Sequence, residues 1–248
     1  MHKIVSACTS ILKDCPNAEK ARNYLNKRIS QETQDKFECG YFPPTSEIDD
    51  LLSFIDIDEL INNELLIQNE GTKDITYSPL SNHNLIIPYK DVYGKIIALV
   101  GRNLLEEDER KEAGISKYKN TSFKKSKHLF ALYEAKHAII ENGFVYLVEG
   151  QFDAIKAHEA GICNVVAIGS SNLSFDQFAL LLRYTNNIKL LLDNDEAGLS
   201  GRKKIMEKFG KYANIENMFI PNGFKDVDEL ISNLKIEDSK SFKKAMIS

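Results

Sequence analysis

The sequence lacks the patterns that several enzyme classes and metal sites require. Its four cysteines form no C-x-x-C pair, so a zinc ribbon or zinc finger has no ligand set and we expect no zinc. The absence of Gly-x-x-x-x-Gly-Lys-Ser/Thr excludes a P-loop ATPase, and the absence of Gly-x-Ser-x-Gly argues against an α/β-hydrolase. No apolar run approaches the roughly 20 residues that a membrane span needs, so we expect no membrane partner.

Composition favours a folded protein of the reducing cytoplasm. The first residues lack the apolar core and cleavage site of a signal peptide, and four scattered cysteines do not make a disulfide framework. With 248 residues and 43% hydrophobic residues, the chain can bury one good core or two small ones. The formal net charge of −4 excludes a globally basic coat for nucleic acid, yet Arg110 to Lys127 holds seven basic residues and one acid.

The first half of the chain mixes helical and strand patterns. Ala18, Ala21, Leu25 and Ile29 recur at helical spacing. Two more helices are expected, over 57–66 and from Leu132 to a stop near Asn142 and Gly143. The expected strands are 36–41 and a hairpin formed by 85–89 and 95–100.

After Gly143, strands and helices alternate regularly. The expected strands are 144–148, 164–168, 188–192 and 215–220. The expected helices are 152–160, 196–209 and 227–234. A fourth helix should start at Ser174, which forms a capping box with Gln177. This order is typical of a parallel sheet with helices on its faces. We therefore expect an α/β protein with an α+β subdomain over 1–142, a Rossmann-like four-stranded parallel sheet with flanking helices over 143–235, and a tail over 236–248.

Two of these strands run directly into carboxylates. Glu149 follows the first strand, and Asp193 and Asp195 follow the third. Because the carboxyl ends of parallel strands share one edge, we expect these three side chains to converge. Clustered carboxylates repel one another unless a cation lies between them, and Mg²⁺ (or Mn²⁺) prefers oxygen ligands and bridges to phosphate. The alternative is that Asp193 and Asp195 are turn residues, with Asp195 as a helix N-cap.

Three further acids belong to the same pattern. Asp153 lies on the first turn after Glu149, where it supports the metal ligands from behind or stabilises a helix N-terminus. Asp226 and Asp228 follow the fourth strand and are candidate ligands of a further metal ion. Helix capping is the alternative for both.

The ordered acidic blocks resemble the TOPRIM domain family. They are Val-Glu-Gly-Gln-Phe-Asp at 148–153, Ala-Ile-Gly-Ser at 167–170 and Leu-Asp-Asn-Asp-Glu-Ala-Gly at 192–198. That family occurs in bacterial primases, in type IA and type II topoisomerases and in some nucleases. The acidic motif alone therefore leaves polymerisation, strand transfer and hydrolysis open.

The first half of the chain resembles the catalytic core of DnaG-type primases. The matching segments are Ala-Arg-Asn-Tyr-Leu at 21–25, Phe-Glu-Cys-Gly-Tyr at 37–41, the hairpin ending in Gly101 and Arg102, and Lys-Tyr-Lys-Asn at 117–120. A further segment near the C-terminus, Lys-Asp-Val-Asp-Glu at 225–229, resembles that family's Lys-Asp-Pro-Asp-Glu motif. Since no segment of this sequence resembles the family's zinc-binding domain or helicase-binding region, we expect neither here.

The resemblance implies a DNA-templated RNA primase that uses Mg²⁺ or Mn²⁺, ribonucleoside triphosphates and single-stranded DNA. Its catalytic carboxylates would be Glu149, Asp193 and Asp195, and its nucleotide or DNA contacts would be Arg102, Lys117, Lys119, Asn120 and Lys125. A replicative helicase is a further partner that the family implies. The alternatives are a TOPRIM nuclease and a non-catalytic nucleic-acid-binding accessory protein.

Overall fold

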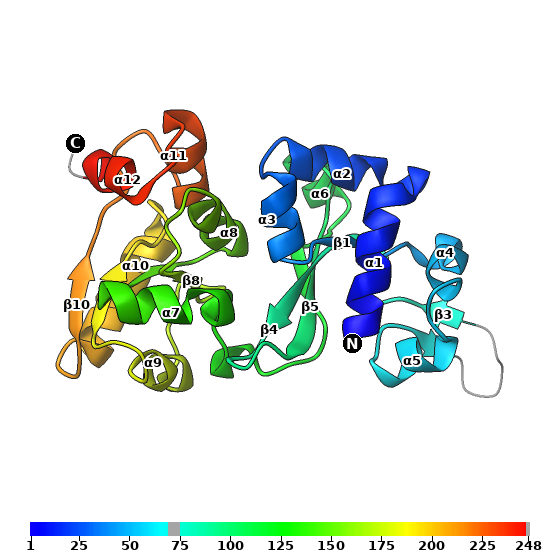
Figure 1. Ribbon diagram of the computed structural model, residues 1–248, viewed down its shortest axis with the longest axis horizontal. Helices are drawn as coiled ribbons and strands as arrows, with labels where there is room; N and C mark the ends of the chain where they lie inside the picture. Colours follow the sequence, from blue (N-terminus) through cyan, green and yellow to red (C-terminus); the bar gives the residue numbers. More distant parts are fainter. Residues whose placement is uncertain (69–74, 247–248) are drawn as a thin grey trace. The chain divides into compact units, whose positions relative to one another are not determined.

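The computed structural model describes residues 1–68 and 75–246 of the chain (Figure 1). The chain divides into two units, Met1–Tyr89 with Ile96–Phe123, and Lys90–Lys95 with Lys124–Ser248. The boundary expected from sequence, between 142 and 143, falls inside the second unit. None of the helices in the described segments combines the length and apolarity that a membrane span requires.

The first unit is built around an antiparallel sheet of four strands in the order β1-β4-β5-β6. Its strands are β1 (Gly40–Tyr41), β4 (Leu85–Lys90), β5 (Ile96–Arg102) and β6 (Tyr118–Asn120), with a separate pair β2 (Ile67–Gln68) and β3 (Ile75–Tyr77). Its helices are α1 (His2–Asp14), α2 (Glu19–Asn26), α3 (Gln31–Lys36), α4 (Asp49–Leu52), α5 (Ile57–Asn62) and α6 (Glu107–Glu112), with short 3-10 turns at Pro16–Ala18 and Thr45–Glu47. Helix α1 packs its apolar face against β1, where a side chain on Gly40 would lie 2.9 Å from Cβ of Cys8.

The expected hairpin is present, and its turn has a clear cause. The Asp91 carboxylate accepts hydrogen bonds from the backbone N–H groups of Tyr93 (2.9 Å) and Lys95 (3.0 Å). Gly94 adopts a φ of 87°, which a residue with a side chain rarely tolerates. The strand expected over 36–41 is confirmed only for Gly40 and Tyr41, because Lys36 ends helix α3. The helix expected over 57–66 ends earlier, at Asn62.

The second unit contains the expected four-stranded parallel sheet, in the order β10-β9-β7-β8. Its strands are β7 (Val145–Val148), β8 (Val165–Ala167), β9 (Asn187–Leu190) and β10 (Asn214–Asn217). Its helices are α7 (Leu132–Asn142), α8 (Gln151–Glu159), α9 (Phe175–Leu181), α10 (Glu196–Phe209), α11 (Val227–Leu234) and α12 (Ser239–Ala245), with a 3-10 turn at Lys125–Lys127. The predicted capping box is confirmed, since the Ser174 hydroxyl accepts from the Gln177 N–H at 3.0 Å.

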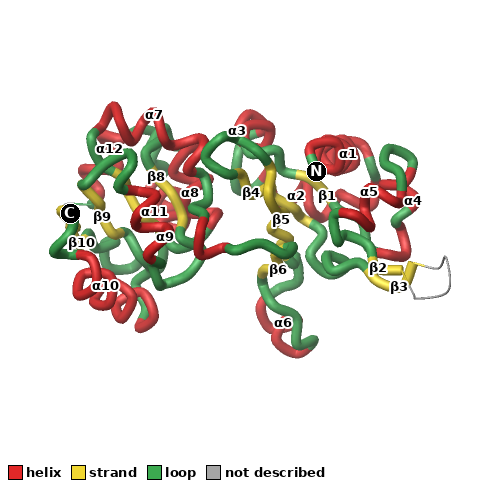
Figure 2. The backbone as a smooth tube through the Cα atoms, turned by 90° about the horizontal axis from the view of Figure 1, so that it is seen from below, coloured by secondary structure: helices red, strands yellow, loops and turns green. Residues whose placement is uncertain are grey.

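Helices cover both faces of this sheet (Figures 1 and 2). Alternate strand residues such as Leu147, Val166 and Leu190 share one buried cluster with residues of α7, α9 and α10. The intervening residue Tyr146 points to the other face, where its ring meets Phe242 of α12 at 5.6 Å between centroids. Helix α7 therefore belongs to the core of this unit. A tail was expected over 236–248, but this segment includes the packed helix α12. Residues 247–248 lie outside the described part.

Candidate active site at the carboxyl edge of the parallel sheet

Glu149 and Asp193 meet because their strands are neighbours in the sheet. Strands β7 and β9 pair in parallel with Leu147 opposite Leu190, so the chain leaves both strands at the same edge. The Asp193 N–H then donates a hydrogen bond to Oε1 of Glu149 at 3.3 Å. The sheet topology thus brings together two carboxylates that are 44 positions apart in the chain.

Asp195 caps helix α10. Its Oδ1 accepts a hydrogen bond from the Gly198 N–H at 2.9 Å, as the N-cap alternative predicted. Gly198 permits the tight turn, because a Cβ there would collide with the carbonyl oxygen of Asp193 and lie 3.0 Å from Oε1 of Glu149. A carboxylate has two oxygens, so one capping bond still leaves Asp195 able to offer its second oxygen to a ligand.

Asp153 links two loops beneath the carboxyl edge. Its side chain is 7% exposed; Oδ2 accepts from the Gly150 N–H at 3.1 Å, and Oδ1 accepts from the Asp228 N–H at 3.0 Å. The loop after β7 is therefore tied to the first turn of α11. The bond to Gly150 is the helix N-terminus alternative, since Asp153 accepts from the N–H of the residue that caps α8.

The loop before α11 also reaches the carboxyl edge of the sheet, which we call the acidic edge because Glu149, Asp193 and Asp195 lie there. Asp226 caps α11 by accepting from the Glu229 N–H at 2.8 Å, and Asp228 is buried. The Asn194 N–H donates to the carbonyl of Lys225 at 2.8 Å, which fixes the Asp193–Asp195 loop against the loop that carries Asp226. Sequence reasoning offered both metal binding and helix capping for Asp226, and the structure shows the capping bond.

The electrostatic centre of this edge is Asp193. Burial, together with the negative charges of Asp153, Glu149, Asp226 and Asp195, raises the pKa of Asp193 from its ordinary 3.8 to about 7. The pKa of Glu149 is raised mainly by burial, and the N–H of Asp193 works against that rise. Burial and mutual repulsion therefore both disfavour the ionised forms of these two carboxyl groups.

The donor groups at this edge suit a hard divalent cation. They are carboxylate oxygens, the ligands that such ions prefer, and a cation would relieve the repulsion that raises the pKa of Asp193. Within the described segments, no three acidic, histidine or cysteine side chains already form a set that could hold a metal ion.

Arg202 is a residue of this region that sequence reasoning missed. It is 3% exposed, and its guanidinium donates to the carbonyl oxygens of Leu192 and Met218. It thereby holds the residue before Asp193, and it offsets part of the negative charge of Glu149 and Asp193. A signal was available, because Gly198, Arg202, Ile205 and Phe209 follow the spacing of the buried face of α10.

The first unit contains a separate arrangement of cations and aromatic rings. The Arg102 guanidinium lies 4.8 Å from the centroid of the Tyr24 ring and 5.1 Å from that of Tyr118, and it donates to the Tyr118 hydroxyl. Arg28 lies over the Tyr24 ring at 5.1 Å. A cavity of about 550 Å³ next to this stack is lined in part by Tyr24, Lys27 and Arg28. The sequence singled out Arg102 but gave Tyr24 and Arg28 no role.

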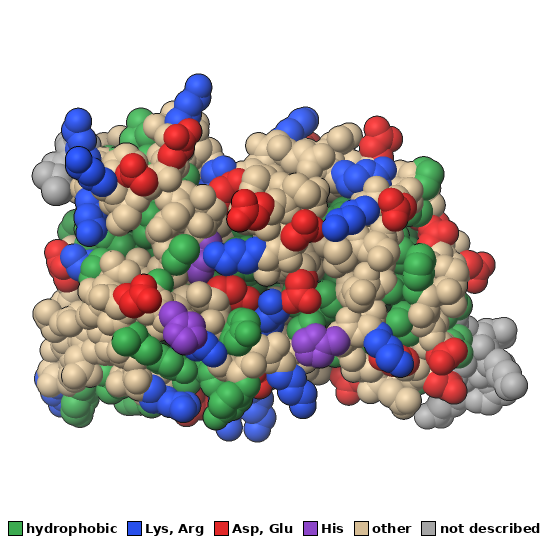
Figure 3. Space-filling model, viewed as in Figure 1, with side chains coloured by type: hydrophobic (Ala, Val, Ile, Leu, Met, Phe, Trp, Pro, Cys, Tyr) green, Lys and Arg blue, Asp and Glu red, His purple; other side chains and the backbone are tan. Residues whose placement is uncertain are grey.

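The remaining predicted nucleotide or DNA contacts divide between the units. Lys119 lies opposite Gly101 in the β5–β6 pairing, so Lys117, Lys119 and Asn120 belong with Arg102 in the first unit. On the face drawn in Figure 3, acidic and basic side chains are both visible over each unit.

Lys125 lies in the second unit, at the carboxyl edge of its sheet. Its Nζ donates to the Gly169 carbonyl at 2.5 Å, and the Gly169 N–H donates to the Glu149 carbonyl at 2.8 Å. Burial lowers the pKa of Lys125. The second unit by itself therefore places one of the predicted lysines beside the acidic loop after β7.

Comparisons with known proteins agree with both halves of the chain. The family model described as "DNA primase catalytic core, N-terminal domain" matches residues 9–136, and the model described as "Toprim-like" matches residues 146–231. The chain belongs to the DNA primase family. The predicted resemblance to DnaG-type primases is thereby confirmed.

Relatives within the primase family cover nearly all of this chain. It is 32% identical to the DNA primase of Aquifex aeolicus over 232 residues, which is 92% of this chain and 45% of that protein. It is 30% identical to the DNA primase of Thermotoga maritima over 252 residues, which is 96% of this chain and 43% of that protein. The chain thus spans less than half the length of these two relatives.

Solved primase structures share the fold. The E. coli primase catalytic core matches with a TM-score of 0.79 and 28% identity over 98% of this chain and 77% of that one. The zinc-binding and RNA polymerase domains of the Aquifex aeolicus primase match with a TM-score of 0.78 and 28% identity over 99% of this chain and 60% of that one. The predicted fold class is confirmed.

Proposed function

We propose that this chain is the catalytic core of a primase that makes short RNA on single-stranded DNA with Mg²⁺ or Mn²⁺. The observation that carries the proposal is a cluster of carboxylates around Asp193, whose negative charges help to raise its pKa. The cluster lies at the carboxyl edge of a TOPRIM-like sheet. A solved relative, 26% identical with a TM-score of 0.76, is a DnaG primase catalytic domain bound to single-stranded DNA. That likeness supports single-stranded DNA as the template here.

Primer extension joins the 3′-hydroxyl oxygen of a ribonucleotide to the α-phosphorus of a ribonucleoside triphosphate. The bond from the α-phosphorus to the bridging oxygen breaks, pyrophosphate leaves, and the hydroxyl proton passes to water. Divalent ions held by Glu149, Asp193 and Asp195 would acidify the hydroxyl and offset the charge of the leaving pyrophosphate. Asp226 and Asp228 are the proposed ligands of a further ion. Divalent metal use follows from the family, and the choice of Mg²⁺ or Mn²⁺ rests on the oxygen-only ligand set.

Two further residues support the carboxylates or contact the nucleotide. Asp153 braces the loops that carry Glu149 and Asp228 through its two backbone hydrogen bonds. Lys125, next to the loop after β7, supplies a cation for the nucleotide phosphates.

Arg102, Lys117, Lys119 and Asn120 are proposed to contact the template backbone or the nucleotide. The two tyrosines beside Arg102 hold its guanidinium in place, which lowers the entropy lost when it binds a phosphate.

A single incubation distinguishes this function from its alternatives. The protein is mixed with single-stranded DNA, labelled ribonucleoside triphosphates and Mg²⁺ or Mn²⁺, and the nucleic acids are separated by length. Short labelled RNA supports the primase, whereas shortened template indicates a TOPRIM nuclease that activates water. Retained DNA without either product indicates an accessory protein.

The matched variants are Asp193→Asn and Asp56→Asn, which make the same change of charge. We expect Asp193→Asn to abolish RNA synthesis. Asp56 is exposed in the first unit, so its variant should keep full synthesis. Full synthesis by Asp193→Asn would refute the proposed metal site.

A further inference from the structure

A hollow lies directly beside the acidic edge, and the proposed catalytic residues do not fill it. Its volume is about 560 Å³. It is lined mostly by Asn194 of the Asp193–Asp195 loop, Leu199 of α10, Phe219 after β10, and Phe224 and Lys225 before α11. We call it the Phe219 pocket.

The apolar wall of the Phe219 pocket is exposed to solvent. Phe219 is 57% exposed and Leu199 is 53% exposed, although both lie next to charged loops. Neighbouring large apolar side chains left in water usually mark a binding surface. The buried Arg202 guanidinium lies 5.0 Å from the centroid of the Phe219 ring, so it supports the ring while much of the ring surface remains accessible.

The polar wall connects the pocket to the proposed metal site. Asn194 stands between Asp193 and Asp195, and its Nδ2 donates to the carbonyls of Ile220 (2.8 Å) and Phe224 (3.1 Å). These bonds fix the Asn194 amide as part of the pocket wall. Any ligand in the pocket therefore lies next to the carboxylates that would bind divalent ions.

We propose that the Phe219 pocket binds the nucleobase of the ribonucleoside triphosphate whose phosphates lie at the acidic edge. The inference rests on the proposed function and names a base subsite for it. An aromatic ring, a fixed amide and an exposed lysine next to a phosphate-binding edge match a nucleotide better than they match an apolar ligand. Stacking on a ring is tolerant of base identity, so this subsite should accept all four bases with little discrimination.

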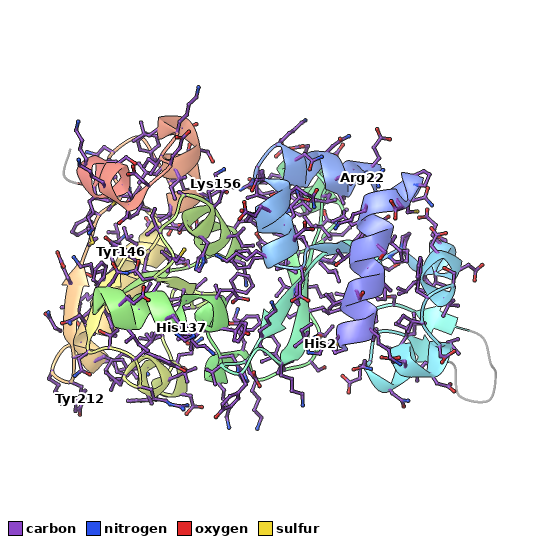
Figure 4. The ribbon with its side chains drawn as sticks, viewed as in Figure 1. His2, Arg22, His137, Tyr146, Lys156 and Tyr212 are labelled. Atoms are coloured by element: carbon purple, nitrogen blue, oxygen red, sulfur yellow. The ribbon has the colours of Figure 1, made fainter. Side chains whose placement is uncertain are left out.

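The sequence contains no tryptophan, so a single Phe219→Trp substitution places a unique fluorescent reporter in the pocket. We expect ATP and GTP, each with Mg²⁺, to quench this tryptophan in a saturable way, because a stacked base quenches an indole ring. Inorganic triphosphate with Mg²⁺ has no base and should leave the fluorescence unchanged. The matched control is Tyr212→Trp, which lies 60% exposed in the turn after α10 (Figure 4) and should respond to neither.

A second variant tests the subsite without the reporter. Phe219→Leu keeps an apolar side chain but removes the stacking ring, so the KM for ribonucleoside triphosphates should rise about tenfold with kcat nearly unchanged. Phe219→Tyr should restore the KM, and the affinity for inorganic triphosphate should be equal in all three proteins. A fall of kcat and of melting temperature without a change of KM would show a purely structural role and overturn the inference.

Equilibrium dialysis of the unaltered protein with ATP separates the two proposals. If ATP binds and RNA is made while the Phe219→Trp fluorescence does not change, the base subsite is wrong and the primase function stands. Equal quenching by ATP and inorganic triphosphate would also overturn the subsite. If the unaltered protein neither binds ATP nor makes RNA, both proposals fail.

Discussion

Replacing Asp193 with asparagine should stabilise the metal-free protein at alkaline pH while abolishing its proposed activity. The reason is the crowding of negative charge at the carboxyl edge, where burial and four neighbouring carboxylates raise the pKa of Asp193 to about 7. Asparagine has nearly the same shape and carries no charge at any pH. The substitution therefore removes the repulsion without opening a cavity.

The sign and the size follow from linkage. The folded-state pKa is higher than the unfolded value, so the contribution of Asp193 to stability is fully present at acid pH and is lost as the pH rises through about 7. A rise of roughly three units at 1.36 kcal/mol each gives an upper limit of about 4 kcal/mol. Asp193 is only half-buried, so screening by solvent reduces this to about 1–2 kcal/mol. For a chain of this size, that is about 2–8 °C in melting temperature.

The assay is thermal unfolding in EDTA at about pH 5 and about pH 8. Asp193→Asn should melt above the unaltered protein at the higher pH, and the advantage should shrink at the lower pH. Asp56→Asn, an exposed position in the first unit, should show no comparable gain. Adding Mg²⁺ should raise the melting temperature of the unaltered protein and leave that of Asp193→Asn nearly constant. A lower melting temperature for Asp193→Asn in EDTA at the higher pH would refute this account of the site.

Three other perturbations test the site and the template contacts. Arg202→Met leaves the carbonyls of Leu192 and Met218 without their donor and should lower the free energy of unfolding by about 2–4 kcal/mol, with Arg202→Lys intermediate, in urea denaturation. Gly198→Ala forces a methyl group against the Asp193 carbonyl and should abolish RNA synthesis with a loss of about 1–3 kcal/mol in stability; normal synthesis would contradict the tight turn. Arg102→Ala should weaken single-stranded DNA binding about tenfold and reduce the slope of log affinity against log salt by about 1, measured by fluorescence anisotropy; an unchanged slope would remove Arg102 from the phosphate contacts.

The alternation of apolar segments and turn signals was sufficient to predict most of the second unit. The predicted helices 196–209 and 227–234 agree with α10 and α11 to the residue. Local chemistry explains this success, because the side chains of Asp195 and Asp226 cap the two helices within their own segments. The first unit was harder to predict, since Lys36 ends a helix where sequence favoured a strand.

The sequence by itself determined which residues end up at the carboxyl edge. Glu149 and Asp193 follow apolar strands of the right length, and parallel strands deliver their ends to one side whatever their order. Tertiary structure alone decided that β7 and β9 are neighbours, that the Arg202 side chain meets the carbonyls of Leu192 and Met218, and that α7 packs in the second unit. These features depend on contacts between segments far apart in the chain, and local periodicity carries no information about which distant segment a buried face will meet.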